Sequence, residues 1–191
     1  MESMFEGALT YNQDLKDWNI SSVPKLDRMF AFTGLFDKDL KDWDVSSVTS
    51  MVSMFHGAEV FNRRMDSEWD VSSVTTMESM FEGALKYNQE INAWNVSSVT
   101  NMDRMFAFAV EYNKKMQGWV VSSVTSMESM FEGALKYNQD IRAWKVLVSS
   151  VTNMDRMFAF AVDYNKKMQD WVVSSVTTME SMFEGALKYN Q

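Results

Sequence analysis

Four aspartates lie close together near the start of the chain, in the pattern Asp37-x-Asp39-x-x-Asp42-x-Asp44. Hard cations such as calcium bind clustered carboxylates, so this segment is a weak calcium candidate. It lacks the glycine and the terminal glutamate of an EF-hand loop, and Trp43 lies within it. The alternative is that these carboxylates form an acidic, solvated surface.

A Ser–His–acid triad needs an oriented histidine, and the chain contains a single one, His56. The equivalent residue in other repeats is Glu or Ala, so we expect His56 on a solvent-facing surface without an orienting partner. The absence of Cys excludes thiol catalysis and cysteine-bound metals, and the net charge of −8 argues against nucleic-acid binding. No run of apolar residues is long enough for a membrane span. The sequence therefore predicts a non-enzymatic protein with no cofactor, no nucleic-acid partner and no transmembrane segment of its own.

The chain consists of about seven and a half tandem copies of one repeat unit. The pair Met–Phe recurs at steps of 25 to 27 residues from Met4 to Met182, and fifteen of the 18 Met fall in two positions of the repeat. We call the residues at one position of successive repeats a column. Apolar columns predict a core made by stacking repeats on one another. The Trp column is expected to lie in this core: Trp18, Trp43, Trp69, Trp94, Trp119, Trp144 and Trp171.

A repeat of this length predicts an α/β fold, a right-handed, leucine-rich-repeat-like solenoid of strand–short helix units in a single domain over residues 1–191. Thr100 followed by Asp103 is typical of a capping box, and Met102 and Met105 recur at helical spacing, which predicts a helix of about ten residues. The W-x-V segment predicts a strand with Trp and Val pointing inward.

Two further columns, one of Phe or Gly and one of Asn, support stacking of the repeats. Phe32, Phe108 and Phe160 occupy a column that is Gly in all the remaining repeats, so each large ring can lie over a small neighbour. An Asn column is expected to point inward and satisfy backbone groups between coils. Its members include Asn88, Asn113 and Asn138.

The string W-N-V-S-S-V-T-N-M-D-R-M-F at residues 94–106, with Y-N-Q-E-I at residues 87–91, closely resembles the BspA-like surface-protein repeat. That leucine-rich-repeat-like unit occurs in mycoplasma lipoproteins, other bacterial surface proteins and marine microbial eukaryotes. The resemblance covers the whole chain. It implies an interaction scaffold at a cell surface or in a secreted protein, and it supplies no catalytic residues.

The residues that flank Trp form a candidate partner-binding strip. They are acidic in the first three repeats and become mixed and partly apolar later. Outer faces of repeat proteins commonly bind partners, although drift on a solvated surface would give the same pattern. The candidates are Asp17, Asp42, Asp44, Glu68, Asp70, Asn95, Val120, Lys145 and Val172.

These observations predict a scaffold for protein–protein interaction, with cell-surface adhesion or recognition as the first hypothesis. The alternative is a structural or linker subunit of a larger assembly, such as an organelle or photosynthetic membrane complex. A second alternative is a glycan-binding surface in which the Trp column forms an exposed ladder. Neither end of the repeat array has a polar cap, so we expect further repeats or partners to cover the ends.

Overall fold

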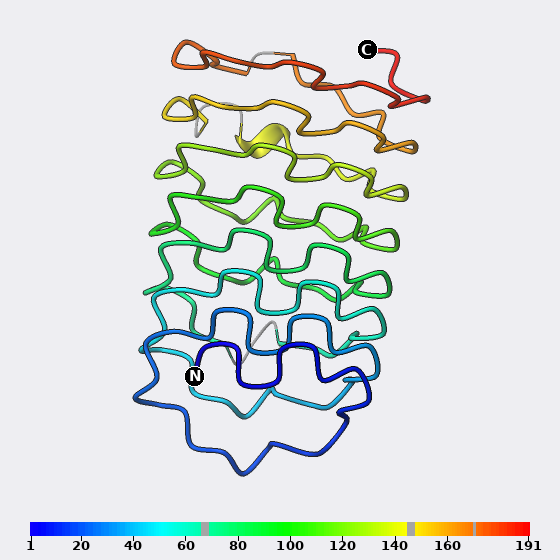
Figure 1. Ribbon diagram of the computed structural model, residues 1–191. Helices are drawn as coiled ribbons and strands as arrows, with labels where there is room; N and C mark the ends of the chain where they lie inside the picture. Colours follow the sequence, from blue (N-terminus) through cyan, green and yellow to red (C-terminus); the bar gives the residue numbers. More distant parts are fainter. Residues whose placement is uncertain (66–68, 145–147, 170) are drawn as a thin grey trace.

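The computed structural model describes residues 1–65, 69–144, 148–169 and 171–191. Within them the chain winds into coils that lie one above another, each coil corresponding to one sequence repeat (Figure 1). Backbone hydrogen bonds join residues about one repeat apart throughout the stack. Glu68 and Lys145 of the predicted partner strip lie outside the described residues.

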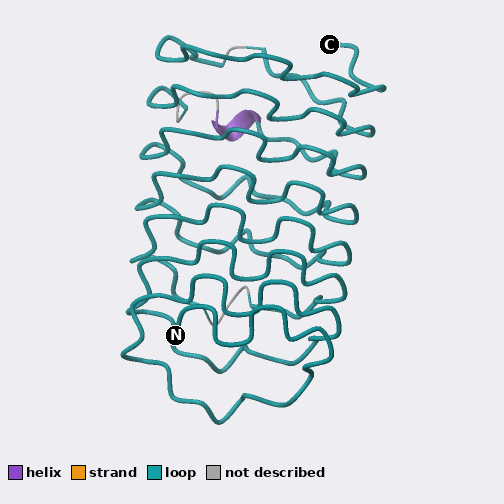
Figure 2. Ribbon diagram, viewed as in Figure 1, coloured by secondary structure: helices purple, strands orange, loops and turns teal. Residues whose placement is uncertain are grey.

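The predicted α/β solenoid is wrong. The helix that the described residues contain is η1, a 3-10 helix at Arg142–Trp144, and Figure 2 shows loops and turns elsewhere in the described chain. Among the residues that the structure describes, parallel pairing is limited to isolated bridges between successive coils, from Lys25↔Ser50 to Asn153↔Thr178, and these form no sheet. The strand–short helix unit and the leucine-rich-repeat-like architecture are therefore both overturned.

The Met–Phe segment forms a series of turns instead of a helix. Arg104, near its middle, has a left-handed backbone with φ of 56°, which an α-helix cannot contain. The N–H of Met105 bonds within the coil to the carbonyl of Met102 at 3.3 Å. The N–H groups of Arg104 and Phe106, by contrast, donate to the next coil, Phe106 to Met130 at 2.9 Å. The spacing that suggested a helix therefore results from consecutive turns that point the same side chains inward.

Thr100 does not cap a helix. Its N–H and its Oγ1 hydroxyl both donate to the carbonyl of Thr75 in the preceding coil, at 2.8 and 3.1 Å. Thr125 donates to Thr100 in the same way. The Thr column thus joins neighbouring coils, and the capping-box prediction is wrong.

The core consists of apolar columns that run along the stack. The Trp119 indole is 1% exposed, and its Nε1 donates to the carbonyl of Ile91 in the preceding coil at 3.0 Å. Phe106 stacks on Tyr112 in its own coil, with centroids 4.1 Å apart, and on Phe131 in the next at 5.7 Å. Trp18 and Trp171, in the outer coils, are half-buried. The other five Trp side chains are buried: Trp43, Trp69, Trp94, Trp119 and Trp144.

The Asn column forms a hydrogen-bonded ladder. The N–H of Asn138 donates to Oδ1 of Asn113, and the N–H of Asn113 donates to Oδ1 of Asn88, each at 3.0 Å. Asp37, the exception in this column, takes part in the same way by accepting from the N–H of Asn62. The column is half-buried or exposed rather than inward, so it satisfies backbone groups at the edge of the core.

Candidate interaction surface

The predicted strip beside Trp is exposed where the structure describes it. Asp17, Asp42, Asp44, Asp70 and Asn95 are exposed, and so are Val120 and Val172. Several of these side chains stabilise the local turn: Asp44 accepts from the N–H and hydroxyl of Ser46, which lowers the pKa of Asp44. Ser72 lowers the pKa of Asp70 in the same way. These residues are therefore exposed, and several of their polar side chains accept hydrogen bonds from their own coil.

Three aspartates of the calcium candidate, Asp37, Asp39 and Asp42, line one surface hollow, but lysine and arginine side chains line it with them. Asp37 accepts from Arg63, with Oδ2 and Nη2 2.6 Å apart, and Asp39 lies 3.7 Å from Lys41. Within the part of the chain that the structure describes, no group of three or more His, Asp or Glu side chains is placed to hold a metal ion.

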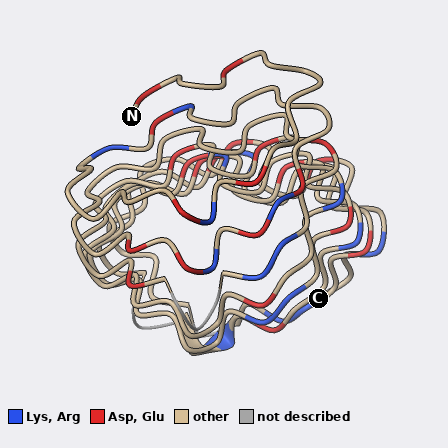
Figure 3. Ribbon diagram, turned by 90° about the horizontal axis from the view of Figure 1, so that it is seen from below, with Lys and Arg blue, Asp and Glu red and all other residues tan. Residues whose placement is uncertain are grey.

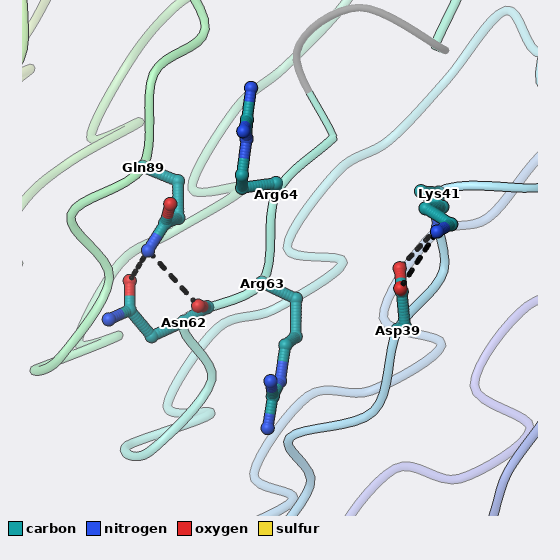
Figure 4. A pocket seen from close by; sticks show the side chains of 6 residues that line it. All are labelled: Asp39, Lys41, Asn62, Arg63, Arg64 and Gln89. Carbon is teal, nitrogen blue, oxygen red and sulfur yellow. Dashed lines mark hydrogen bonds and ion pairs between the residues drawn. The ribbon is translucent and has the colours of Figure 1, made fainter.

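A polar hollow of about 530 Å³ lies on the outer surface near these residues (Figure 4). The Gln89 amide donates to Oδ1 of Asn62 at 2.8 Å, and Lys41 faces Asp39. The charged lining of the hollow is predominantly basic; Lys41 pairs with Asp39 inside the hollow, and Arg63 pairs with Asp37, which is outside the lining. Its lining residues are Asp39, Lys41, Asn62, Arg63, Arg64 and Gln89.

Two kinds of coil make up most of the stack. One carries Ser-x-x-Glu-Gly in its Met–Phe segment, as at residues 79–83, and we call it the Glu–Gly coil. The other carries Arg-x-x-Ala-Phe, as at residues 104–108, and we call it the Arg–Phe coil. Charged positions recur in rows along the stack as a result (Figure 3). The alternation has structural consequences that the repeat pattern alone did not show.

Arginine of the Arg–Phe coil pairs with glutamate of the preceding Glu–Gly coil. The Arg104 guanidinium donates two hydrogen bonds to Glu82, and Arg156 does the same to Glu132. Glu82 is 7% exposed, and burial by itself raises its pKa; hydrogen bonds from Arg104 and Ser79 outweigh burial and hold the pKa below its usual value. These bidentate pairs link coils and keep the carboxylates ionised.

His56 lies where the alternation is broken: its coil reads Ser-x-x-His-Gly at residues 53–57 and is followed by a Glu–Gly coil instead of an Arg–Phe coil. Its Nδ1 is 3.8 Å from Oε2 of Glu82, and its ring centroid is 4.7 Å from that of Phe32. The side chain is half-buried, not solvent-facing as predicted, and burial lowers its pKa. A glutamate at this position would face the carboxylate of Glu82, which the neutral imidazole avoids.

An exposed apolar strip is the feature that the sequence analysis missed. It combines the Phe column with exposed Leu and Val side chains that lie two or three residues after the Phe or Gly of that column, at one corner of successive coils. The Phe108 ring is 42% exposed and Leu85 is 37% exposed. The signal was the Phe in a Gly column, which we assigned to packing alone. The strip comprises Leu9, Phe32, Leu35, Val60, Leu85, Phe108, Leu135, Phe160 and Leu187.

Comparison with known families explains the repeat organisation. A family model described as "Mycoplasma protein of unknown function, DUF285" matches residues 1–67, 65–148 and 147–191, which together span the chain. The chain belongs to the DUF285 family. Tandem DUF285 matches confirm a repeat protein, and the family description is compatible with a mycoplasma surface repeat, although it does not name the BspA-like unit.

Other comparisons add no relative. Neither the curated proteins nor the solved structures gave a match to this DUF285 chain. Among the described residues, no helix combines the length and apolar character that crossing a bilayer requires.

Proposed function

We propose that this DUF285 chain is a non-enzymatic scaffold that binds a protein partner through the apolar strip. The observation that carries the proposal is the strip itself, which places large apolar side chains in solvent over much of the stack. Contiguous exposed apolar surface is costly in water and typically marks an interaction site. Repeat proteins commonly use such extended faces for binding.

The backbone of the Phe column supports a functional role for the exposed rings. Phe32, Phe108 and Phe160 have φ of 57–58°, in the left-handed region that bulky residues avoid. Glycine adopts this conformation at the equivalent place in the other coils, for example Gly133 with φ of 64°. A left-handed backbone costs about 1–2 kcal/mol at each Phe, and Gly would avoid this cost. An exposed Phe at such a position is therefore better explained by a binding surface than by the turn alone.

The setting we favour is adhesion or recognition at a cell surface. The resemblance to BspA-like surface repeats and the mycoplasma family description support this setting. A structural or linker subunit would use the same strip, and the identity of the partner distinguishes the two roles. The buried indoles from Trp43 to Trp144 offer no exposed ladder for glycan stacking.

Site-specific photocrosslinking tests the proposal. A benzophenone amino acid is placed at Leu85 or Leu135 on the strip, and at Asn95 or Val120 beside the Trp column as matched exposed controls. After irradiation in extract of the source cells, we expect one partner protein to crosslink from both strip positions and from neither control. A Leu135→Asp variant that keeps its melting temperature should lose the crosslink at position 85. Crosslinking of the partner from the control positions alone would overturn the assignment of the strip.

A further inference from the structure

Each ring of the Phe column packs onto a glycine of the following coil. A Cβ atom built on Gly57 would lie 2.7 Å from Cδ1 of Phe32, and one on Gly133 would lie 2.5 Å from Cδ1 of Phe108. Phe160 covers Gly185 in the same manner. The stack therefore shows three times that a phenyl ring fits over the glycine of the next coil.

Gly83 differs from Gly57, Gly133 and Gly185, the other glycines of this column that have a preceding coil. A Cβ on Gly83 would meet the Cα and N atoms of Gly57 at 3.6 Å, with no ring nearby. The cause is the break in alternation: the coil at residues 53–57 ends in His-Gly and precedes the Glu–Gly coil at residues 79–83, so the preceding coil supplies Gly where Phe would stand. We call this place the Gly57–Gly83 step.

Apolar side chains precede and follow the step along the stack, and the contact between His56 and Glu82 lies next to it in the same two coils. Phe32 precedes it along the stack and Phe108 follows it, and each is 42% exposed. Val60 and Leu85, which lie at the corner of the same two coils, are 36% and 37% exposed. The step is thus a gap of one ring in the apolar strip, bordered by the strip's own residues.

Glu59 places an unpaired charge beside the step. It is the one acidic residue in a column that is otherwise Leu, Val or Gly, and it is exposed two residues after Gly57. No described residue donates a hydrogen bond or forms an ion pair with its carboxylate. Acidic residues of the adjacent corner column, by contrast, are paired, as Glu111 is with Lys136 at 2.6 Å. A free carboxylate at the edge of an apolar gap complements a basic group on a partner.

We propose that the Gly57–Gly83 step binds an aromatic side chain of a protein partner, with an adjacent Lys or Arg of that partner paired to Glu59. This inference rests on the proposed scaffold function and assigns the anchor of its interface. Interfaces concentrate their binding free energy in a few aromatic or Arg residues seated in complementary sites. The net charge of −8 also favours encounter with a basic segment.

Selective labelling makes the test direct, because the chain has seven glycines. The full chain is labelled with ¹⁵N-glycine and titrated with the blocked tetrapeptide acetyl-Ala-Phe-Lys-Ala-amide. We expect saturable shifts of the Gly57 and Gly83 signals and unchanged signals of Gly133 and Gly185, whose sites are filled. Acetyl-Ala-Ala-Lys-Ala-amide should bind at least about tenfold more weakly, and replacing Lys by Glu should weaken binding about threefold or more. Equal shifts at Gly83 and Gly133, or no shift at saturating peptide, would overturn the proposal.

Variants separate the step from the rest of the strip. The exchange Phe32→Gly with Gly57→Phe keeps the composition and lets the new ring cover Gly83, so it should abolish the Gly83 shift. Leu85→Ser should weaken peptide binding about fivefold or more, while Leu135→Ser, in the same column beside a covered glycine, should leave binding unchanged. Peptide binding that survives both the exchange and Leu85→Ser would refute the site. If the exchange variant does not fold, the two leucine variants still distinguish a site at the step from binding elsewhere on the strip.

The two proposals can fail separately. If the partner crosslinks at Leu135 but the peptide does not bind at the step, the anchor is wrong while the scaffold function stands. The loss of both results would refute both proposals.

Discussion

Tyr112 carries a hydroxyl group that is buried without a hydrogen-bond partner among the described protein groups. The same column contains Phe36 and Phe61, which lack the hydroxyl and pack in the same way. Ring centroids of Phe61 and Tyr87 are 6.0 Å apart, and those of Tyr112 and Tyr137 are 6.1 Å apart. The column therefore accepts Phe without rearrangement, and Tyr112→Phe should stabilise the protein.

The expected gain follows from the cost of burying a polar group. A hydroxyl that leaves water and finds no partner costs about 1–3 kcal/mol. Removing its oxygen leaves a small void, which offsets part of this gain at about 24 cal/mol per Å³. We therefore expect Tyr112→Phe to raise the free energy of unfolding by about 1 kcal/mol at neutral pH.

The pH dependence gives a second readout. Burial holds the pKa of Tyr112 well above its usual value of 10.0, so the folded protein binds this proton more tightly than the unfolded chain. The stability due to this difference is complete below pH 10 and is lost as the pH rises further. The advantage of Tyr112→Phe over the natural chain should consequently grow between pH 10 and pH 11.

Urea unfolding followed by Trp fluorescence measures these changes at equal m-value. Tyr189→Phe is the matched control, because Tyr189 is half-buried in the last coil and its hydroxyl is not among the buried, unpaired groups. It should change stability by less than about 0.5 kcal/mol. Destabilisation by Tyr112→Phe of about 1 kcal/mol or more would show that the hydroxyl has a stabilising partner and would refute the reasoning.

Other predictions concern the ladder, the core and the break in alternation. Asn113→Ala removes the acceptor of the Asn138 N–H and should cost about 1–2 kcal/mol in urea unfolding. Trp119→Ala empties a site in the core and should cost about 3–5 kcal/mol, measured by calorimetry. An NMR titration of His56 should give a midpoint below pH 6.5, because burial disfavours the charged imidazole in the folded state. The free energy of unfolding that depends on neutral His56 is therefore complete above pH 6.5 and is lost as the pH falls through the folded pKa. His56→Glu should lower the melting temperature at pH 7 by facing Glu82, whereas His56→Ala should not.

The Asn113, Trp119 and His56 titration predictions each have a result that would contradict them. An Asn113→Ala protein as stable as the natural chain would mean that water replaces the ladder bond. Unchanged stability of Trp119→Ala would place the indole outside the core. A His56 midpoint at or above 6.5 would mean that the attraction of Glu82 exceeds the effect of burial.

The apolar periodicity predicted which side chains face inward but not how the backbone turns. Met102, Met105 and Phe106 are all buried, in agreement with one inward face. Their spacing of three and one also suits a helix, and the sequence offered no reason to prefer turns. The decision lies in backbone groups: Arg104 adopts a left-handed conformation and donates its N–H to the next coil, so the N–H groups serve two coils alternately. A helix would satisfy the backbone N–H groups within one coil. The sequence of a single repeat does not show whether these groups bond within the coil or to the neighbouring coil.

The candidate surface was predictable only in part. The strip beside Trp is exposed where it is described, and the Phe-over-Gly arrangement follows from the sequence because a large side chain needs a small neighbour. The exposed apolar strip did not follow, since the same Phe residues could have been buried. Exposure depends on the left-handed turn that directs each ring to the corner of its coil.

The sequence by itself determined the repeat, the composition of the core and the lack of Cys chemistry, because these depend on residue types and their period. Only the tertiary structure decided which coil each side chain meets. Arg104 pairs with Glu82 of the preceding coil, whereas Phe108 covers Gly133 of the following one. These partners are about one repeat away in either direction, so the sequence offers both choices equally. The geometry of stacking selects one of them, and with it the uncovered step at Gly83.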